Sequence, residues 1–499
     1  MIPSISLAAL LASLPTPPVL VSGDGRGDTD VHLLCDDSGC ACEGALFVCI
    51  RGAASDGHRY LPAAYEAGCR LFLVETDERP SLPTDATVYR SDDTHRDLAY
   101  LAAAYYGHPA RRLRMVGITG TKGKTTVALM CRHMLEAQGE SVGYIGTSGV
   151  YFADTVKGTS NTTPGALELH RLLAEMVEAG VTTAVLEVSS QALWQRRVDG
   201  VRFDVCALTN LSPDHIGAPE HPSLEHYAAC KRRLLTDFGA TALVTNADAP
   251  TVSEDSLQGL VRCGLAADAT VRALDIRQEL CGVIPSTVFT CRTPSEYLNV
   301  RMPLLGIHNV QNALFALAIV RALGASLTDA AASLADVTIA GRFETLEVKG
   351  ALVVIDYAHN GAALRAMLTT LRALSPTRLL CLFGSVGGRT QCRRAELGAV
   401  ADELADFTYL TADDPNFEAV EDICRDIAAA FRPRFLPNYT VIPDRAEAIR
   451  AALDELREGD ILLLAGKGDE RTQRIAGRTI PHRDRDVVEA YIRQSVLPV

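Results

Sequence analysis

Short apolar segments rich in β-branched residues alternate with helix-like segments along most of the chain. Several of the apolar segments are continuous rather than interrupted by polar residues, which is typical of parallel strands covered on both faces. The alternation therefore predicts an α/β protein, with sheets wound by helices on both sides. We expect strands at 45–50, 70–74, 115–119, 184–188, 206–209, 242–245, 352–355, 379–383, 407–411 and 461–465.

Two breaks divide the chain into regions of domain size. A length of 499 residues suits about three domains at roughly 150 residues each. A helix-like stretch ends at Gly107-His108-Pro109, and a new strand follows. A helix-like stretch at 308–324 and another ending near Ala335 precede Gly341-Arg342-Phe343-Glu344. We therefore expect domains at 1–110, 111–340 and 341–499.

Composition and charge exclude several classes of function. The chain has 48 basic and 61 acidic residues, a formal net charge of −13. This balance argues against broad nucleic-acid binding, which needs a positive face. An aromatic content of 6% offers little for base stacking. A hydrophobic content of 47% excludes a disordered chain and is ample for several cores.

The N-terminal segment predicts a packing helix rather than a signal peptide. No Lys or Arg precedes its apolar stretch, and four leucines recur at helical spacing. No apolar run of the sequence reaches the ~18 residues of a membrane span. We expect a cytoplasmic protein without a membrane partner. The four leucines are Leu7, Leu10, Leu11 and Leu14.

The cysteines predict free thiols. The 14 cysteines are scattered along the chain. Cys35, Cys40 and Cys42 lie close together but have no second pair at zinc-site spacing. A reducing compartment suits this pattern better than a disulfide scaffold does.

The strongest local signal is Gly117-Ile118-Thr119-Gly120-Thr121-Lys122-Gly123-Lys124-Thr125-Thr126. A β-rich strand leads into it and an amphipathic helix follows, which is the context of a phosphate-binding P-loop. The glycines let backbone N–H groups converge on phosphate oxygens, and the helix N-terminus adds positive charge. Ile118 stands where the standard pattern has its first glycine, so this is the shorter Gly-Thr-x-Gly-Lys-Thr form. The alternative is a glycine-rich turn that binds nothing.

The P-loop pattern assigns roles to individual residues. Lys124 is expected to pair with the β- and γ-phosphates of ATP, and Thr125 to place its hydroxyl on Mg²⁺. Glu187 ends a second strand, and a carboxylate at the end of a neighbouring parallel strand is well placed to hold Mg²⁺. The expected ATP contacts from the loop are Gly120, Thr121, Lys122, Gly123, Lys124, Thr125 and Thr126.

A series of short motifs resembles the Mur ligases, and within them the MurE group of UDP-N-acetylmuramoyl-tripeptide synthetases. The resemblance also includes residues 37–58, similar to the uridine-binding domain of that group, and it covers nearly the whole chain. Each motif alone is weakly specific, whereas their common order is strongly so. The motifs are the P-loop, Asn161-Thr162-Thr163-Pro164, Glu187-Val188-Ser189-Ser190, Arg197-Val198-Asp199-Gly200, Thr209-Asn210-Leu211-Ser212-Pro213-Asp214-His215, Gly341-Arg342-Phe343-Glu344, Asp356-Tyr357-Ala358-His359, Phe383-Gly384, Asp413-Asp414-Pro415-Asn416 and Gly466-Lys467-Gly468.

The resemblance implies a three-domain architecture with a P-loop central domain and a Rossmann-like C-terminal domain. It also implies a reaction of peptidoglycan precursor synthesis, in which ATP activates a carboxylate as an acyl phosphate and the amine of an amino acid attacks it. The carboxylate belongs to UDP-N-acetylmuramoyl-L-alanyl-D-glutamate, and the enzyme is expected to be a monomer. Such an enzyme needs no Ser or Cys nucleophile, because it works by positioning its anionic partners and neutralising the phosphoryl group.

The resemblance further implies roles for matching residues. Lys231 stands where the family has a carbamylated lysine (N6-carboxylysine), whose carbamate can ligate a second Mg²⁺. His215 matches a histidine near the metals, and Ser38 would contact the uridine nucleotide. The muramoyl-dipeptide end would be held by Asn161, Thr162, Thr163, Ser189, Gln195 and Arg197. ATP would also be contacted by His308, Asn309 and Asn312 near adenine, and by Arg342 and Asp356 from the third domain after domain closure.

The loops after the third-domain strands are expected to hold the amino acid. In relatives that add meso-diaminopimelate, the four-residue motif ends in Arg, which can grip the distal carboxylate bidentately. Asn416 takes that place here, so L-lysine is the favoured substrate, with L-ornithine, meso-diaminopimelate or another amino acid as alternatives. The expected amino-acid contacts are Arg389, Asp413, Asp414, Pro415, Asn416, Gly466 and Glu470.

Several departures from the family leave other functions open. Lys122 stands where the family usually has Asn, and residues 216–221 lack the usual second Asp. One alternative is a divergent amide ligase resembling folylpolyglutamate synthetases, and another is a non-catalytic ATP-binding protein. The Ser38 region and the Asn161-Thr162-Thr163-Pro164 motif argue against the former. The retained Lys124, Glu187, Lys231 and Asp356 argue against the latter.

Overall fold

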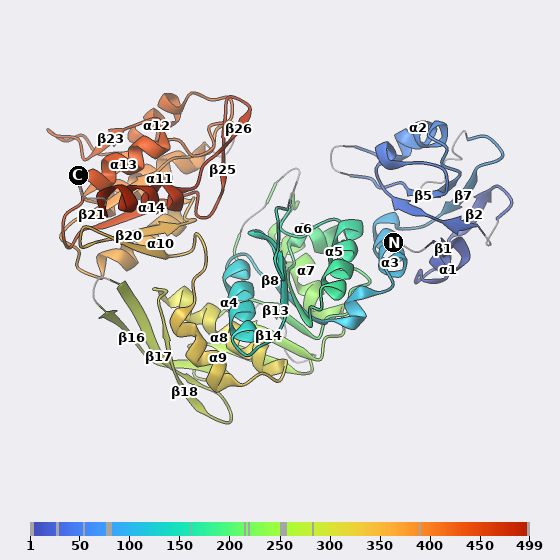
Figure 1. The fold of residues 1–499 in the computed structure, drawn as a ribbon, viewed down its shortest axis with the longest axis horizontal. Helices are drawn as coiled ribbons and strands as arrows, with labels where there is room; N and C mark the ends of the chain where they lie inside the picture. Colours follow the sequence, from blue (N-terminus) through green and yellow to red (C-terminus); the bar gives the residue numbers. More distant parts are fainter. Residues whose placement is uncertain are drawn as a thin grey trace. The chain divides into compact units, whose positions relative to one another are not determined.

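The computed structural model describes residues 4–25, 29–52, 55–75, 82–159, 161–213, 216–217, 220–249, 257–281, 284–388 and 391–496. The chain forms two compact units, and Figure 1 labels helices and strands along the chain. Unit 1 comprises residues 1–272, 292–296 and 311–330, and unit 2 comprises residues 273–291, 297–310 and 331–499.

Unit 1 begins with a five-stranded sheet in the order β2-β7-β6-β5-β4. Strands β4 to β7 are parallel, and β2 is antiparallel to β7. Side chains of α1 and α3 pack on one face of this sheet, and those of α2 pack on the other. The elements are β1 (Ile5–Ser6), α1 (Leu7–Ala12), β2 (Val19–Ser22), β3 (Asp30–Val31), β4 (Leu33–Cys35), η1 (Ser38–Cys40), β5 (Ala45–Val48), η2 (Gly57–Tyr60), α2 (Leu61–Glu66), β6 (Leu71–Val74), β7 (Thr87–Arg90), α3 (Thr94–Tyr105) and η3 (Pro109–Arg112).

The second sheet carries the P-loop. Its parallel strands run in the order β9-β12-β8-β13-β14-β15, with the antiparallel β10 and β11 beyond β9. Strand β16 pairs with the end of β15, and β17 and β18 follow it in the order of strands. The strands are β8 (Arg114–Thr119), β9 (Val142–Gly146), β10 (Gly149–Phe152), β11 (Thr155–Lys157), β12 (Thr183–Glu187), β13 (Val205–Leu208), β14 (Ala242–Asn246), β15 (Leu260–Gly264), β16 (Val271–Cys281), β17 (Ile284–Arg292) and β18 (Tyr297–Met302).

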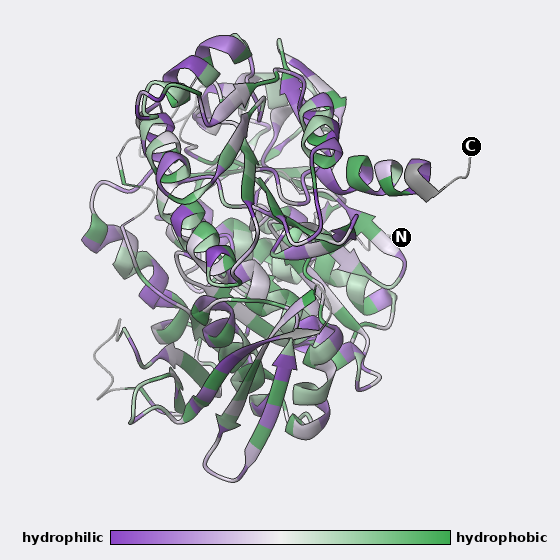
Figure 2. Cartoon of the chain, turned by 90° about the vertical axis from the view of Figure 1, so that its left-hand side faces the viewer, coloured by the Kyte–Doolittle hydropathy of each residue, from purple (hydrophilic) through white to green (hydrophobic). Residues whose placement is uncertain are grey.

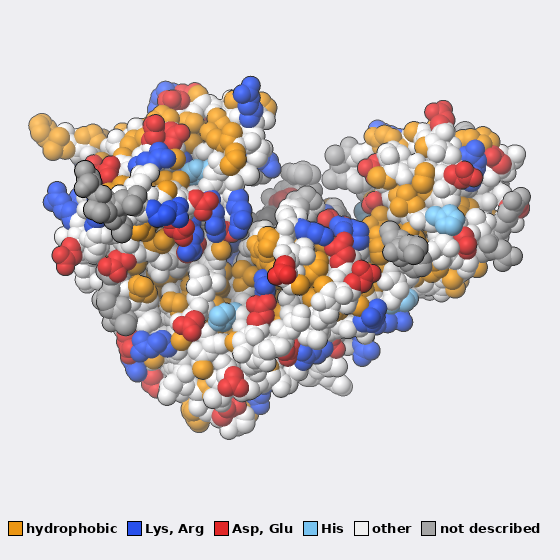
Figure 3. Space-filling model, viewed as in Figure 1, with side chains coloured by type: hydrophobic (Ala, Val, Ile, Leu, Met, Phe, Trp, Pro, Cys, Tyr) orange, Lys and Arg blue, Asp and Glu red, His pale blue; other side chains and the backbone are white. Residues whose placement is uncertain are grey.

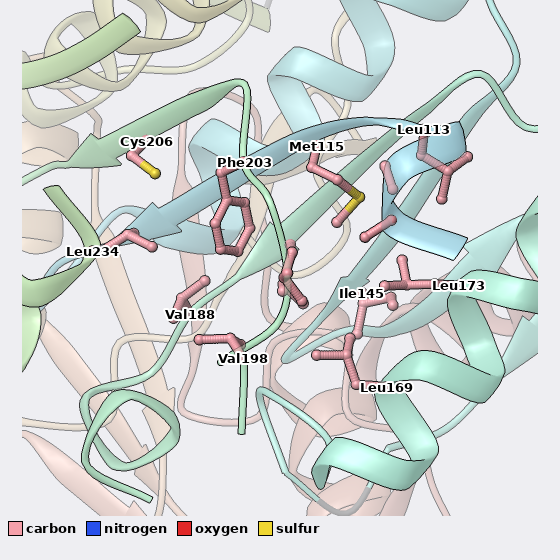
Figure 4. Close-up of a cluster of buried hydrophobic side chains, with 14 of the residues drawn as sticks. Leu113, Met115, Ile145, Leu169, Leu173, Val188, Val198, Phe203, Cys206 and Leu234 are labelled. Atoms are coloured by element: carbon pink, nitrogen blue, oxygen red, sulfur yellow. The ribbon is translucent and has the colours of Figure 1, made fainter. Parts of the chain in front are cut away.

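Helices α5 and α7 cover one face of this sheet. Figure 4 shows Leu169 and Leu173 of α5 beside Ile145, and Phe203 between Leu234 of α7 and Met115, and all of them are buried. The buried residues of α4 lie outside this cluster, so α4 packs on the opposite face. The helices are α4 (Lys124–Glu136), α5 (Ala166–Glu178), α6 (Ser190–Trp194), α7 (Leu224–Thr236), α8 (Ile307–Ala322) and α9 (Leu327–Ser333), followed by η5 (Leu334–Asp336).

Unit 2 contains a six-stranded sheet in the order β19-β20-β24-β21-β22-β23. All strands from β20 to β23 in that order are parallel, and β19 is the antiparallel edge. Side chains of α13 and α14 pack on one face. The elements are β19 (Glu344–Val348), β20 (Ala351–Asp356), α10 (Gly361–Arg372), β21 (Leu379–Phe383), α11 (Cys392–Leu404), β22 (Phe407–Leu410), α12 (Val420–Ala428), β23 (Tyr439–Val441), α13 (Arg445–Asp454), β24 (Ile461–Ala465), β25 (Thr472–Ile475), β26 (Arg478–Pro481) and α14 (Asp484–Val496).

The expected α/β fold and every expected strand are confirmed, with strand ends within two residues of their expected positions. The expectation for the N-terminal helix was too long. Helix α1 spans Leu7–Ala12 alone, because Pro15, Pro17 and Pro18 follow and cannot donate helical hydrogen bonds. Leu14 lies beyond the helix and is still buried.

The surface and the thiols agree with the composition. Figure 3 shows acidic and basic side chains interspersed over the visible face, and Figure 2 shows hydrophilic and hydrophobic residues alternating along the outer helices. All cysteines whose side chains the structure describes are free thiols. Among the described helices, none is both long and apolar enough to cross a membrane.

Candidate functional site

The P-loop connects β8 to α4, as its sequence predicts. Gly120 and Gly123 have φ angles of 144° and 88°, a region that other residues rarely adopt. A Cβ atom on Gly120 would lie 2.0 Å from Thr209 Oγ1, and one on Gly123 would lie 2.5 Å from Asn312 Oδ1. Both positions therefore require glycine for conformation and for space.

The segment after β13 holds the P-loop by hydrogen bonds. Thr209 Oγ1 donates to the carbonyl of Lys122 at 2.7 Å, and the Asn210 side chain also donates to that carbonyl at 2.9 Å. The Asn210 amide oxygen accepts from the backbone N–H of Lys122 at 2.9 Å. Thr121 Oγ1 accepts from Tyr227 at 3.0 Å. The loop conformation is thus fixed by side chains from two other elements.

Two lysines converge on one carbonyl of the loop. Lys124 Nζ donates to the carbonyls of Gly120 at 2.9 Å and Thr121 at 3.2 Å. Lys231, on α7 and only 2% exposed, donates from Nζ to the same Gly120 carbonyl at 2.8 Å. Two ammonium groups beside converging N–H groups form a locally cationic site, which suits a phosphate.

Glu187 lies beside the loop, as the parallel pairing of β12 with β8 requires. Its backbone is in register with Ile118, and its side chain is buried. Tyr144 donates to Oε1 at 2.5 Å, and Thr147 donates from its backbone to Oε1 and from its hydroxyl to Oε2. Burial raises the pKa of Tyr144 well above its usual value, and the Glu187 carboxylate raises it further.

The oxygen atoms beside the P-loop supply part of a binding site for a hard cation. Thr125 supplies a buried hydroxyl at the start of α4, and Glu187 supplies carboxylate oxygens on the adjacent strand. These are oxygen ligands of the type that Mg²⁺ takes. Lys231 is different, because an ammonium group cannot ligate a cation and only a carbamate on Nζ could do so.

Residues expected at the muramoyl-dipeptide end come together around Thr163. The Thr163 hydroxyl donates to the Glu187 carbonyl at 2.8 Å and accepts from the backbone N–H of Ser189 at 3.0 Å. Arg197 donates to the Thr163 carbonyl at 2.8 Å and to Gln195 Oε1 at 2.6 Å. Burial lowers the pKa of Arg197. Asn161 and Thr162 belong to the same loop, with Thr162 Oγ1 at 3.0 Å from Thr147 Oγ1.

The remaining expected residues of unit 1 lie apart from this cluster or outside the described residues. Ser38 begins η1, which follows β4 of the N-terminal sheet in the chain. Asn312 lies on α8 beside Gly123. His215 lies outside the described residues, so the structure neither supports nor opposes its role.

In unit 2, the expected ATP residues lie at the start of α8, just before β19 and at the end of β20. Asp356 is buried and accepts from the backbone N–H of Phe343 at 2.9 Å. Burial raises the pKa of Asp356, and the neighbouring Arg342 opposes that shift. The Arg342 guanidinium lies over the Tyr357 ring, 4.5 Å from its centroid. At the start of α8, Asn309 donates to the Leu305 carbonyl, and His308 lies against Gly306.

The expected amino-acid loops meet at the carboxyl ends of β22 and β24, around a lysine. Lys467 is fully buried, and its Nζ lies 2.8 Å from Asp414, 2.6 Å from Glu470 and 3.9 Å from Asp413. Burial alone would lower the pKa of Lys467, but the surrounding carboxylates, Asp413 foremost, raise it. Burial raises the pKa of Asp413. Three carboxylates thus surround one ammonium group.

Asn416 holds its own loop in place by hydrogen bonds. Its side-chain amide donates to the carbonyls of Gly387 and Asp414, each at 3.1 Å, and its φ is 54°. Asparagine tolerates this left-handed conformation better than most residues. Pro415 is buried in the same turn, and Gly466 approaches Asp413. Arg389 lies outside the described residues.

Sequence reasoning missed several residues that organise these sites. Tyr144 and Thr147 hold Glu187 but belong to no motif, and they are 43 and 40 positions away in the chain. In the sequence, Lys467 stands out only as part of a Gly-Lys-Gly motif, although a lysine two residues after an apolar strand is a usable signal. Arg445 is buried with Asp484, and it donates to the carbonyls of Ala412 and Ala465 behind the amino-acid loops.

Comparison with known protein families gives two matches. Residues 118–320 match the Mur ligase middle domain, and residues 341–468 match the Mur ligase, glutamate ligase domain.

Curated relatives and solved structures extend the similarity to nearly the whole chain. The UDP-N-acetylmuramoyl-L-alanyl-D-glutamate--2,6-diaminopimelate ligase of Caldanaerobacter subterraneus subsp. tengcongensis is 35% identical, covering 94% of this chain and 96% of that protein. The ligase of the same name from Chlorobaculum tepidum is 36% identical, covering 99% and 98%. A solved structure of a ligase of that name has a TM-score of 0.72 at 25% identity, covering 99% of this chain and 100% of the other.

Proposed function

Because the chain belongs to the Mur ligase family, we propose that it adds an amino acid to UDP-N-acetylmuramoyl-L-alanyl-D-glutamate at the expense of ATP. The observation that carries this proposal is a P-loop flanked by Glu187 and Lys231 in a chain related along its full length to ligases named for that dipeptide. The reaction belongs to peptidoglycan precursor synthesis. We place it in the cytoplasm, where ATP is available and free thiols persist.

The proposed chemistry has two steps. The substrate carboxylate attacks the γ-phosphorus of ATP, which forms an acyl phosphate and releases ADP. The amine of the amino acid then attacks the acyl carbon, and phosphate leaves as the amide forms. The loop N–H groups and Lys124 neutralise the transferring phosphoryl group, which is the largest contribution that a protein makes to such a transfer. Lys124 must exchange its bonds to Gly120 and Thr121 for bonds to phosphate.

Thr125, Glu187 and a carbamate on Lys231 would hold Mg²⁺ in this proposal. The ion, when bound, neutralises charge on the phosphates. Tyr144 and Thr147 donate to both oxygens of Glu187, so they hold the carboxylate in one orientation. Carbamylation would turn Lys231 from a cation into an anionic ligand.

The other binding roles extend the same proposal. Ser38 contacts the uridine nucleotide, and the Thr163 cluster with Asn161, Thr162, Ser189, Gln195 and Arg197 holds the muramoyl dipeptide. His308, Asn309 and Asn312 serve the nucleotide, and Arg342 and Asp356 reach ATP after closure. His215 and Arg389 keep the roles expected from the family. In this proposal residues 1–110 bind the UDP-sugar, residues 111–340 bind ATP and residues 341–499 bind the amino acid, and the enzyme is a monomer.

We propose L-lysine as the amino acid. Asn416 stands where the family pattern for diaminopimelate has Arg, and its amide donors are directed at loop carbonyls. It offers no positive charge for a distal carboxylate. The carboxylates of Asp413, Asp414 and Glu470 outnumber the single ammonium of Lys467, which favours a substrate with a distal cation.

A second candidate substrate is meso-diaminopimelate, which the names of the relatives favour. The test incubates the protein with the UDP-dipeptide, ATP and Mg²⁺, and with lysine, ornithine or diaminopimelate in separate reactions. Product mass and phosphate release are measured. We expect lysine to give the highest kcat/KM. Efficient use of diaminopimelate without use of lysine would overturn the lysine assignment and leave the ligase assignment intact. Phosphate release that no amino acid stimulates would overturn the ligase assignment itself.

A further inference from the structure

Two histidines and a cysteine of unit 1 converge beside α6 and α7. His221 and His226 face each other through their Nδ1 atoms, 2.9 Å apart. Cys230 Sγ lies 3.9 Å from His226 Nδ1, and one ligand atom from each residue falls within 4.8 Å of the others. His226 and Cys230 are one helical turn apart on α7, so both side chains lie on one face of the helix.

The spacing of these atoms suits one tetrahedral ion. Zinc bonds of about 2.0–2.1 Å to nitrogen and 2.3 Å to sulfur place ligand atoms about 3.3–3.6 Å apart. Two of the three separations, 2.9 and 3.9 Å, bracket that range and the third lies within 4.8 Å, so side-chain rotations would seat an ion. Imidazole and thiolate are ligands for Zn²⁺-like ions, whereas Mg²⁺ takes oxygen ligands.

A second layer of contacts holds His221 in place. His221 is fully buried, and its Nε2 lies 2.9 Å from Ser190 Oγ at the start of α6. When Nε2 donates to that hydroxyl, Nδ1 keeps its lone pair for an ion. Partners of this kind fix the tautomer and orientation of histidine ligands in metal sites. The Trp194 ring lies 5.6 Å from the His221 ring and 5.2 Å from the His226 ring, and it screens one side of the cluster.

We propose that His221, His226 and Cys230 form a binding site for a divalent transition-metal ion with the ligand preference of Zn²⁺. Three protein ligands leave the fourth position to water. Binding displaces the thiol proton of Cys230 to solvent and moves any proton between the two Nδ1 atoms to Nε2 of His226, so that each ligand atom offers a lone pair. This site uses none of the P-loop ligands and does not depend on the proposed ligase activity.

The neighbourhood gives the ion a structural consequence. The coordinate bonds would join the loop at His221 to helix α7, and the Ser190 hydroxyl connects His221 to α6 by a hydrogen bond. Helix α7 also carries Tyr227 and Lys231, which hydrogen-bond the P-loop. A bound ion would therefore stabilise the folded form, because any ligand that binds only the native state does so.

Titration with Co²⁺ tests the site in a Cys40→Ser/Cys42→Ser background, which removes the exposed thiols found among the described residues. Excess Mg²⁺ is present to occupy oxygen-ligand sites. We expect a thiolate-to-cobalt charge-transfer band that saturates near about one equivalent, a band that Zn²⁺ abolishes by competition, and a rise in melting temperature with Zn²⁺. Absence of the band in this folded protein overturns the proposal.

Variants identify the ligands. Cys230→Ser should abolish the charge-transfer band, and His226→Gln, at a partly exposed position, should weaken Co²⁺ binding at least about tenfold. Ser190→Ala should weaken it by about tenfold through the orientation of His221. Cys424→Ser, at another buried thiol, is the matched control and should keep the band. A band that survives Cys230→Ser, or binding that is unchanged in His226→Gln, overturns the assignment. Circular dichroism checks that each variant is folded.

Discussion

At the scale of single residues, buried charged and titratable groups determine the chemistry of this chain. Lys231, Glu187 and Lys467 are all buried, and each contacts at least one partner that is distant in the sequence. The motifs point to Glu187 and Lys231 as site residues, whereas Lys467 stands in a motif without an assigned role. Their partners could not be predicted, since Tyr144 and Asp414 come into contact only through the fold.

Removal of Lys231 tests its proposed carbamate role. We expect Lys231→Ala to lower kcat by at least about 10²-fold, because both the ligand and the contact to the Gly120 carbonyl are lost. Added bicarbonate should not restore activity. Steady-state phosphate release provides the measurement, and Arg232→Ala, at the exposed neighbouring position on α7, is the control. Wild-type turnover in Lys231→Ala would contradict the role.

Asn416→Arg tests the basis of substrate choice. An arginine would offer a bidentate partner for a distal carboxylate, so the ratio of kcat/KM for diaminopimelate over lysine should rise by about tenfold or more. The positive φ and the two lost amide bonds should also cost about 1–2 kcal/mol of stability. Asn416→Gln controls for the loop bonds without adding charge. An unchanged ratio in Asn416→Arg would contradict the interpretation of this loop.

His170 predicts a pH-dependent stability. It is fully buried on α5, its ring nitrogens have no hydrogen-bond partner among the described residues, and burial lowers its pKa to about 3. Below about pH 6.5, His170 is protonated in the unfolded chain but stays neutral in the folded one. The free energy of unfolding therefore falls on acidification from pH 6.5 toward 3. Over this range, His170 lowers the free energy of unfolding by about 1.4 kcal/mol for each unit of pH decrease.

Urea unfolding of the wild type and His170→Leu at about pH 6.5, 5.5 and 4.5 measures this dependence. The wild type should lose more stability across the series, and the gap should widen by roughly 1.4 kcal/mol per unit. His32→Gln, at an exposed position, is the control. Parallel pH profiles for the wild type and His170→Leu would contradict the prediction.

At the scale of elements, the buried parallel strands were predictable and the exposed antiparallel ones were not. Strands such as β12 and β24 are buried at every position, so their apolar runs are continuous. Strand β26 is exposed throughout, and β18 alternates buried with exposed residues. Such strands resemble loops in the sequence, because their pairing partners decide their structure. The sites at the ends of β8, β12, β22 and β24 follow from the predictable set.

One ion pair ties the elements of unit 2 together behind the amino-acid loops. Arg445 of α13 and Asp484 of α14 are both fully buried, 2.6 Å apart, and Arg445 also donates to Ala412 and Ala465. Burial opposes the charge of Asp484, but Arg445 holds its pKa well below the usual value. Stability from this carboxylate is therefore present above its unfolded pKa and is lost as the pH falls through the folded one.

Asp484→Asn should destabilise the folded protein by about 3–5 kcal/mol, because it leaves a buried guanidinium uncompensated. Replacing both partners, as in Arg445→Met/Asp484→Leu, should cost less than the single change. Thermal unfolding of the variants measures both effects. A double variant less stable than Asp484→Asn would show that the pair contributes more than it costs to bury.

At the scale of the whole molecule, the proposed reaction requires groups from both units. The P-loop belongs to unit 1, whereas Arg342 and Asp356 belong to unit 2. We expect catalysis to depend on closure. Small-angle scattering should show a smaller radius of gyration with the UDP-dipeptide and a non-hydrolysable ATP analogue than without ligands. Lys124→Ala, which should bind the analogue weakly, is the control. No change in the wild type would contradict closure.

Gly120 and Gly123 of the P-loop also limit which substitutions the chain can accept. Any side chain at 120 or 123 meets Thr209 or Asn312 at less than 3 Å, whereas a Cβ atom at Gly158 or Gly165 meets nothing within 4 Å. Gly165 also precedes α5, where serine or aspartate would cap the helix. Random mutation followed by selection would therefore replace Gly158 and Gly165 freely and return glycine at 120 and 123. Substitutions should therefore accumulate at positions such as Gly158 and Gly165, where no atom of the described residues lies within 4 Å of an added Cβ atom.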